Sequence, residues 1–329
     1  MLPTPSDVHV NAPLTQISIA YRQDQSRFVA SRIFPTVPVQ KQSDRYYTYD
    51  RGYFNRDEME MRAPSTESAG TGYKVDNTPT YFCQEWALHQ DVPDQVIANA
   101  DSVVRPLMDA TELLTVKSLI RREKLFVNSY FKGGVWTSDF DGVASGNAWG
   151  SGTVLQWNDA NSTPIEDVRK AQTTVLERTG FLPNKLVIGK AAYDALIDHP
   201  DLVDRIKYGQ TPGAPAIVNK QALAALFEID SVEVMSAIEN TANEGATNSH
   251  SFIGGKKALL VYSAPNPGLM TPSGGYVFEW VGMYGGSFGQ RISSFRMDEL
   301  KSTRIEIEAC FDMKLISADL GFFFDSITA

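Results

Sequence analysis

Apolar and polar residues follow two different periods along the chain of 329 residues. In residues 107–131 apolar positions recur every three or four residues, which predicts a helix about 40 Å long at ~1.5 Å per residue. Pro106 stands at the start, where proline suits the first turn. A second helix is predicted from Thr163, where Thr-Pro-Ile-Glu has capping-box spacing, to a C-terminal cap at Gly180.

Strict alternation, the period of a strand, dominates other segments. Residues 304–308 alternate between charged and apolar, which predicts a half-buried antiparallel sheet near the C-terminus. Alternation at Tyr47/Tyr49 and at Tyr81/Cys83 predicts the two strands of a ribbon. Residues 132–163 are rich in Gly, Ser and Asn and are expected to form a surface connection.

The first forty residues combine apolar side chains with prolines at positions 3, 5, 13, 35 and 38. Proline fixes φ and removes a hydrogen-bond donor, so an extended segment is expected. Its apolar side chains need a surface to cover them, and they include Ile17, Ile19, Tyr21, Phe28 and Phe34. Two arrangements fit equally: a strap over the chain's own domain, or an arm laid on a neighbouring subunit.

Composition narrows the class of protein. With 43% hydrophobic and 21% charged residues the chain can bury a globular core. The net charge of −9 argues against general attraction to nucleic acid, although it does not oppose a protein that encloses DNA. The two cysteines, Cys83 and Cys310, lack CxxC spacing and are expected to be reduced and buried. No signal peptide or apolar run of membrane length is found, so no membrane partner is expected.

The Gly189-Lys190 turn, between an apolar strand and a helix, resembles part of a phosphate-binding loop. Such a loop needs a glycine five positions before Gly-Lys and a hydroxyl directly after it, but Asn184 and Ala191 occupy these positions. The four scattered histidines predict no metal site. Acidic residues near His199 are interpreted as helix caps, with Asp201 starting a helix. We therefore predict no cofactor and no enzyme activity.

The order of the segments, together with three stretches, carries a resemblance. The stretches are "VPDQVIANAD", "ATELLTVKSLIRREKLFVN" and "GFLPNKLVIGKAAYDALIDHPDLVDRIKY", followed by a β-rich C-terminus. The whole chain resembles the major capsid proteins of tailed bacteriophages, the Hong Kong 97 fold, an α+β class. The resemblance implies these segments: N-terminal arm 1–39, β-ribbon E-loop 40–80, peripheral domain 81–149 and 276–329 with spine helix 107–131, and α/β axial domain 150–275.

The resemblance also implies a function. Copies of the chain would assemble as hexamers and pentamers of an icosahedral shell enclosing double-stranded DNA, contacted non-specifically. Scaffolding, portal and cement or decoration proteins would be further partners. The location would be the virion, assembled in the cytoplasm of a bacterial host. Two alternatives stay open: an encapsulin-type cellular compartment and a stand-alone α/β enzyme.

Contacts between subunits would hold such a shell together. Lys41 and Lys74 flank the ribbon, but nothing marks them for covalent cross-linking, so noncovalent joints are expected. The candidate interface residues lie on the arm, the ribbon and the spine helix: Ile17, Ile19, Tyr21, Phe28, Phe34, Arg51, Arg56, Asp57, Glu58, Glu60, Arg121, Arg122 and Glu123.

Overall fold

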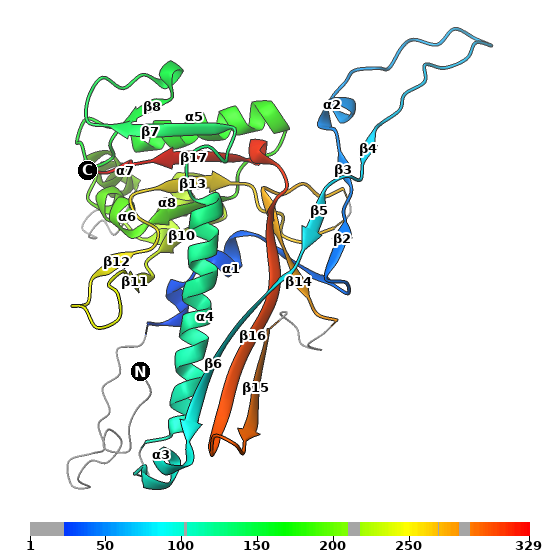
Figure 1. The fold of residues 1–329 in the computed structure, drawn as a ribbon. Coiled ribbons are helices and arrows are strands. Elements are labelled where there is room, and N and C mark those ends of the chain that lie inside the picture. Colours follow the sequence, from blue (N-terminus) through cyan, green and yellow to red (C-terminus); the bar gives the residue numbers. More distant parts are fainter. Residues whose placement is uncertain (1–22, 102–103, 210–217, 269, 283–289) are drawn as a thin grey trace.

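The structure is a computed structural model that describes residues 23–101, 104–209, 218–268, 270–282 and 290–329. Two β-sheets, one long helix and a projecting β-ribbon make up this part of the chain (Figure 1). We call the sheet that contains β9 the axial sheet and the sheet that contains β16 the peripheral sheet. This mixture of helices and sheets confirms the predicted α+β class.

Six strands form the axial sheet, in the order β10-β9-β13-β17-β7-β8. β13 is antiparallel to both of its neighbours, and the other pairs are parallel. The strands are β7 (Ser138–Val143), β8 (Thr153–Leu155), β9 (Lys185–Gly189), β10 (Ser231–Met235), β13 (Ala258–Val261) and β17 (Gly321–Asp325). The helices packed around them are α5 (Pro164–Thr179), α6 (Lys190–Ile197), α7 (Pro200–Gly209) and α8 (Lys220–Leu226). Sheet and helices enclose one apolar core.

Local sequence signals fix the ends of these helices. α5 has Thr163 at its N-cap, Pro164 in its first turn and Gly180 at its C-cap, where φ is 77°. The predicted ends are confirmed, but the capping box is not formed, because the Thr163 side chain makes no capping hydrogen bond. Asn219 caps α8 as expected, and its Oδ1 accepts from the Ala222 N–H at 2.8 Å.

The peripheral sheet is organised around β16, the longest strand. β15 and β6 pair with its first half, β14 pairs with its second half, and β1 adds to β14 in parallel. Ile305 and Ile307 are buried while the charged residues between and beside them are not, which confirms the alternation predicted for 304–308. The strands are β1 (Thr36–Val39), β6 (Gln84–Pro93), β14 (Gly275–Trp280), β15 (Gln290–Met297) and β16 (Ser302–Leu315).

Helix α4 spans Pro106–Tyr130, so both ends of the predicted spine helix were right to within one residue. It runs beside β6 and β16 (Figure 1). Near its start, Ala110 and Leu114 pack on Ile305 and Ile307 of β16. Near its end, Phe126 enters a second core that also contains residues of both sheets. The helix therefore packs against both sheets and connects them.

Residues 23–39, which we call the strap, pack on their own chain. The strap contains η2 (Gln25–Arg27), α1 (Ala30–Ile33) and β1. The Phe34 ring meets Phe126 and Tyr130 edge-on, with ring centroids 5.4 and 5.5 Å apart. Phe28 is buried against Ala237 and Ile253. Phe28 and Phe34, both predicted at a subunit interface, are therefore covered by the chain's own core.

Glu123 on α4 holds the strap in place. Its carboxylate, buried completely, accepts hydrogen bonds from the backbone N–H groups of Val29 at 3.0 Å and Ala30 at 2.9 Å. Burial raises the pKa of Glu123 to about 7, against the opposing effect of these two N–H donors. Glu123, also predicted at a subunit interface, thus has as its partners the N-terminal N–H groups of α1 in the same chain.

Strand pairing brings into one sheet segments that the sequence analysis assigned to different domains. β7 and β17 fall in the segments assigned to a peripheral domain, yet both lie inside the axial sheet. Residues 132–163, expected as a surface connection, supply two strands, β7 and β8, of that sheet. The reason is long-range pairing: Phe322–Asp325 lie in register with Ser138–Asp141, a match that local composition does not reveal.

A narrow ribbon over residues 43–82 projects from the body (Figure 1). β2 (Ser43–Arg45) pairs with β5 (Thr80–Phe82), and further out β3 (Thr48–Tyr49) pairs with β4 (Val75–Asp76). The short helix α2 (Arg51–Phe54) follows β3. Every residue from 54 to 78 is exposed. The two predicted ribbon strands are confirmed.

The remaining elements complete the described chain. They are α3 (Asp94–Asn99), η3 (Trp149–Ser151), η4 (Ala318–Leu320) and a hairpin of β11 (Ile238–Asn240) with β12 (His250–Phe252). Cys83 and Cys310 are free and buried, as predicted. Burial raises the pKa of the Cys83 thiol to about 12 and that of Cys310 to about 11, which keeps both thiols protonated at neutral pH.

Removing the ring of Phe34 should destabilise the whole body. We expect Phe34→Ala to lower the free energy of unfolding by about 3–5 kcal/mol, because it leaves a cavity among Phe126, Tyr130 and the strap. Urea unfolding of the unassembled chain measures this change. Phe295→Ala, at a ring 41% exposed on β15, is the matched control and should change stability by less than ~1 kcal/mol. Equal effects of the two substitutions would contradict the buried position of the strap.

Glu123 should make the chain less stable as the pH rises. Its folded pKa of about 7 lies above the ordinary 4.5, so it contributes stability below pH 4.5 that is lost between pH 4.5 and 7. Glu123→Gln removes this titration. We expect the variant to gain on the order of 3 kcal/mol relative to wild type across this interval, measured as unfolding free energy against pH. A difference that stays constant with pH would count against a buried, titrating Glu123.

Candidate functional site

The Gly189-Lys190 turn serves the framework of the axial sheet. A Cβ atom at Gly189 would come within 2.0 Å of the Gly255 carbonyl oxygen, so this glycine permits close contact between two backbones. Lys190 forms an ion pair with Asp194 one turn along α6. Packing of the backbone therefore accounts for the glycine, and a pair within the helix accounts for the lysine.

Among the described residues, the arrangement that most resembles a catalytic group is a buried serine–histidine pair. Ser162 Oγ lies 3.0 Å from His199 Nε2, and the Asp159 carbonyl oxygen lies 3.1 Å from the same nitrogen. His199 Nδ1 accepts from the Asp201 N–H at 3.2 Å, so His199 supplies the cap that the sequence assigned to Asp201. Both ring nitrogens have structural partners and the histidine is 2% exposed. The pair fixes the start of α7.

Within the described ranges, no group of three or more His, Cys, Asp or Glu residues could hold a metal ion. In the same ranges, no helix has the length and apolar character that crossing a membrane requires.

The ribbon exposes apolar side chains to solvent to an unusual degree. Met59 is 94% exposed and Met61 is 99% exposed, so neither of these apolar side chains packs within the chain. Asp57, Glu58 and Glu60, all predicted interface residues, are exposed between and beside them. The distal ribbon thus presents two flexible thioethers inside an acidic surface, a combination suited to an adaptable protein contact.

Aromatic side chains stiffen the ribbon below this surface. Tyr49, Phe54 and Tyr73 form a cluster with ring centroids 5.9–6.3 Å apart. The Arg56 guanidinium, another predicted interface group, lies 5.0 Å from the Tyr53 ring centre on the same segment. These contacts hold the outgoing and returning segments together where the ladder of β3 and β4 is only two residues long.

The base of the ribbon is fastened to the peripheral sheet. Tyr81 stacks on Phe278 of β14 with ring centroids 4.6 Å apart, and Tyr46 lies against the same ring. The Phe82 N–H donates to the Asp312 carboxylate at 2.9 Å. This end of the ribbon is therefore part of the body.

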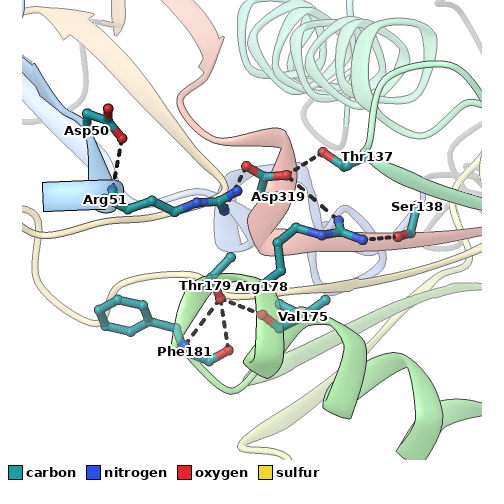
Figure 2. A network of polar contacts seen from close by, with 10 residues as sticks. Asp50, Arg51, Thr137, Ser138, Val175, Arg178, Thr179, Phe181 and Asp319 are labelled. Atoms are coloured by element: carbon teal, nitrogen blue, oxygen red, sulfur yellow. Dashed lines mark hydrogen bonds and ion pairs between the residues drawn. The ribbon is translucent and has the colours of Figure 1, made fainter. Parts of the chain in front are cut away.

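Arg51 reaches from the ribbon to a second point on the body, Asp319. Arg51 Nη1 lies 2.8 Å from Asp319 Oδ2, and the Thr137 hydroxyl donates to Oδ1 at 2.8 Å. Figure 2 shows the Arg178 guanidinium beside the same carboxylate, with Nη1 3.8 Å from Oδ1, while Nη2 donates to Ser138 Oγ at 2.8 Å. Arg51, predicted in a pair between subunits, thus has a carboxylate partner in its own chain.

The two arginines predicted on the spine helix are likewise engaged internally. Arg121 lies over the Trp86 ring at 4.2 Å from its centre. Arg122 Nη2 donates to Glu279 Oε1 at 2.8 Å, and Glu279 is 1% exposed. Burial raises the pKa of Glu279, and the Arg122 charge opposes that effect. Both arginines, predicted at a subunit interface, therefore pack α4 on the peripheral sheet of the same chain.

One exposed apolar groove was not predicted. It lies between the first turns of α4 and strand β15, has a volume of about 310 Å³ and is lined by Leu107, Met108, Ile292 and Ile305 among others. The helical period over residues 107–131 does not show where the sheet stops covering the helix. Ile17, Ile19 and Tyr21, the remaining predicted interface residues, lie outside the described residues.

Comparison with known proteins gives this geometry a family context. The model of a family described as phage major capsid protein E matches residues 142–273. The major capsid protein of Pseudomonas phage JBD67 is 27% identical over 321 residues, which cover 97% of each chain. That of Burkholderia phage BcepMu is 23% identical over 330 residues, covering 97% of this chain and 96% of the relative.

Solved structures share the fold at lower sequence identity. A phage-related protein from Bordetella bronchiseptica RB50 has a TM-score of 0.66 at 21% identity, over 93% of each chain. The capsid of cyanophage P-SCSP1u has a TM-score of 0.58 at 9% identity, over 97% of this chain and 93% of that one. The SrpI encapsulin from Synechococcus elongatus PCC 7942 has a TM-score of 0.56 at 12% identity, over 96% and 92%.

Fold likeness alone includes both phage capsids and an encapsulin, so the sequence relatives decide between them. Both curated relatives and the matched family are phage capsid proteins. The chain is thus similar in sequence to major capsid proteins of phages, and it shares the Hong Kong 97 fold with solved phage capsids.

Proposed function

We propose that copies of this chain assemble into hexamers and pentamers of an icosahedral shell that encloses the double-stranded DNA genome of a tailed phage. The observation that carries the proposal is the ribbon, on which residues 54–78 are all exposed and two methionines are almost fully so. A ribbon this narrow is marginally stable in isolation. Contact with a neighbouring copy would bury its apolar side chains and offset the entropy cost of ordering it.

The body offers a surface that an assembly would cover. The groove beside Leu107 and Met108 is exposed and apolar in the single chain, and exposed apolar surface of this kind commonly marks a protein contact. Predicted interface residues Arg56, Asp57, Glu58 and Glu60 remain candidates for charge pairs between copies. We propose that these joints are noncovalent: Lys41, near the ribbon base, forms an ion pair with Asp44 at 3.3 Å.

Other partners are proposed at a coarser level. A net charge of −9 suits an inner wall that touches packaged DNA without binding it tightly. Scaffolding, portal and cement or decoration proteins would complete the particle, with assembly in the cytoplasm of the bacterial host. Shells purified from infected cells distinguish the encapsulin alternative by their content: double-stranded DNA supports a phage capsid, and a cargo enzyme without DNA supports a compartment.

The exposed methionines of the ribbon provide a direct test. We expect the double variant Met59→Asp, Met61→Asp to fold normally but to form shells roughly ten-fold less efficiently or worse, because two desolvated charges oppose the contact. Negative-stain microscopy and sedimentation of wild type and variant measure the fraction in capsomers and shells.

Met270→Asp is the matched control, since Met270 is 56% exposed and lies between β13 and β14, outside residues 43–82. This control should assemble as wild type does. Wild-type chain that stays monomeric at high concentration, with and without co-expressed phage proteins, would contradict the proposed function. Normal shells from the double variant would contradict the role of the ribbon tip.

A further inference from the structure

The ribbon contains a point at which it can bend. Between the ladders β2–β5 and β3–β4, two residues on the outgoing segment face three on the returning one. Pro79 lies in this interval and has no N–H, and the Tyr46 N–H donates to its carbonyl oxygen at 3.1 Å. Unequal numbers of residues interrupt a ladder and bend it, as in a β-bulge. The distal ribbon, residues 48–76, is therefore connected to the ribbon base through a weakly paired interval, which we call the joint.

One ion pair bridges this joint. Among the described residues, the contact between Arg51 and Asp319 is the hydrogen bond or ion pair that connects residues 48–76 to the body. The other polar and ring contacts of the distal ribbon stay within the ribbon itself. The direction of the distal ribbon thus depends on where Asp319 holds Arg51.

Asp319 is itself held firmly. It belongs to η4, between the last strand of the peripheral sheet and β17 of the axial sheet. Thr137 donates to its carboxylate, and the Thr137 N–H donates to the neighbouring Ala318 carbonyl oxygen at 3.3 Å. The carboxylate is therefore a fixed reference on the body, at the place where both sheets meet.

A second cationic side chain, that of Arg178, lies beside the same carboxylate. Arg178 Nη1 is buried, has no hydrogen-bond partner in the described chain and lies 3.8 Å from Asp319 Oδ1. If Arg51 moves away with the ribbon, Asp319 keeps a cationic partner (Figure 2). Release of the ribbon therefore leaves no carboxylate without a counter-charge, which lowers the cost of changing the ribbon angle.

We propose that Asp319 is the positioning residue of the ribbon: its contact with Arg51 sets the angle at which the ribbon meets the next copy, and Arg178 takes over the carboxylate when that angle changes. The inference rests on the proposed function, because the next copy is the partner. A rotation at the base of the ribbon displaces its tip by a larger distance. Glu60 lies nine positions after Arg51, a reach of up to ~30 Å in extended chain, so a small rotation at Arg51 moves the tip by many ångströms.

The test measures the ribbon angle and assembly separately. Ser68→Cys on the ribbon and Glu177→Cys on α5 are both exposed and accept spin labels, while the native cysteines are buried. Double electron–electron resonance on the unassembled chain gives the distribution of distances between them. We expect a narrow distribution in this labelled parent and a broad one after Arg51→Met or Asp319→Asn. Both variants, without labels, should give several-fold fewer uniform shells, with tubes or open sheets in their place.

The design includes a matched control and a test of coupling. Arg205 and Asp201 form an ion pair within α7 with side-chain exposures of 44% and 31%, close to the 45% and 29% of Arg51 and Asp319. Arg205→Met should leave both readouts unchanged. The double variant Arg51→Met, Asp319→Asn should be no worse than Arg51→Met alone, because both substitutions remove one contact.

The outcomes separate the two proposals. If the wild-type chain forms no shells, the proposed function fails. If wild type forms shells and Arg51→Met keeps the narrow distance distribution, the positioning role of Asp319 is overturned. A broad distribution with uniform shells overturns it as well, because the angle would then not direct assembly. Arg51 is exposed on the ribbon, so its variant tests the idea even where Asp319→Asn affects the body.

Discussion

The structure depends on burial of the strap between α4 and the two sheets. Phe34 occupies the centre of this contact, against Phe126 and Tyr130, in a core that also takes Val187 from the axial sheet and Val277 from the peripheral sheet. One cluster of side chains thus fixes the relative positions of both sheets. Without it the long helix would touch the peripheral sheet at one end and have little to pack on at the other.

In the same region, buried charged side chains have partners within the body. Glu123 caps α1 of the strap, and Arg122, its neighbour in sequence, pairs with Glu279 of β14. Adjacent residues on one helix therefore bind two different elements. Each buried carboxylate has its own donors, as burial of a charge requires. Such pairs contribute specificity of arrangement as much as stability, because a strap in another position would leave Glu123 buried without its N–H partners.

The sequence predicted what depends on local signals. Periodicity located α4 to within one residue at each end, and Pro164 with Gly180 marked the ends of α5. Long-range pairing lay beyond such signals. Nothing near Phe322 indicates that it lines up with Ser138, and nothing near Arg51 indicates Asp319. Charged residues on an exposed-looking segment were for this reason predicted to pair between subunits, although several of them pair within the chain.

This division of partners separates folding from assembly. The body uses Arg121, Arg122 and Glu123 for its own cohesion, while the distal ribbon keeps Met59 and Met61 exposed. A body that satisfies its own charges can fold before it meets a partner. An exposed ribbon joined to it by a bend and one ion pair can then adapt its direction to the partner it meets. Because subunits in hexamers and pentamers meet at different angles, a building block for both needs this combination of a rigid body and an adjustable contact.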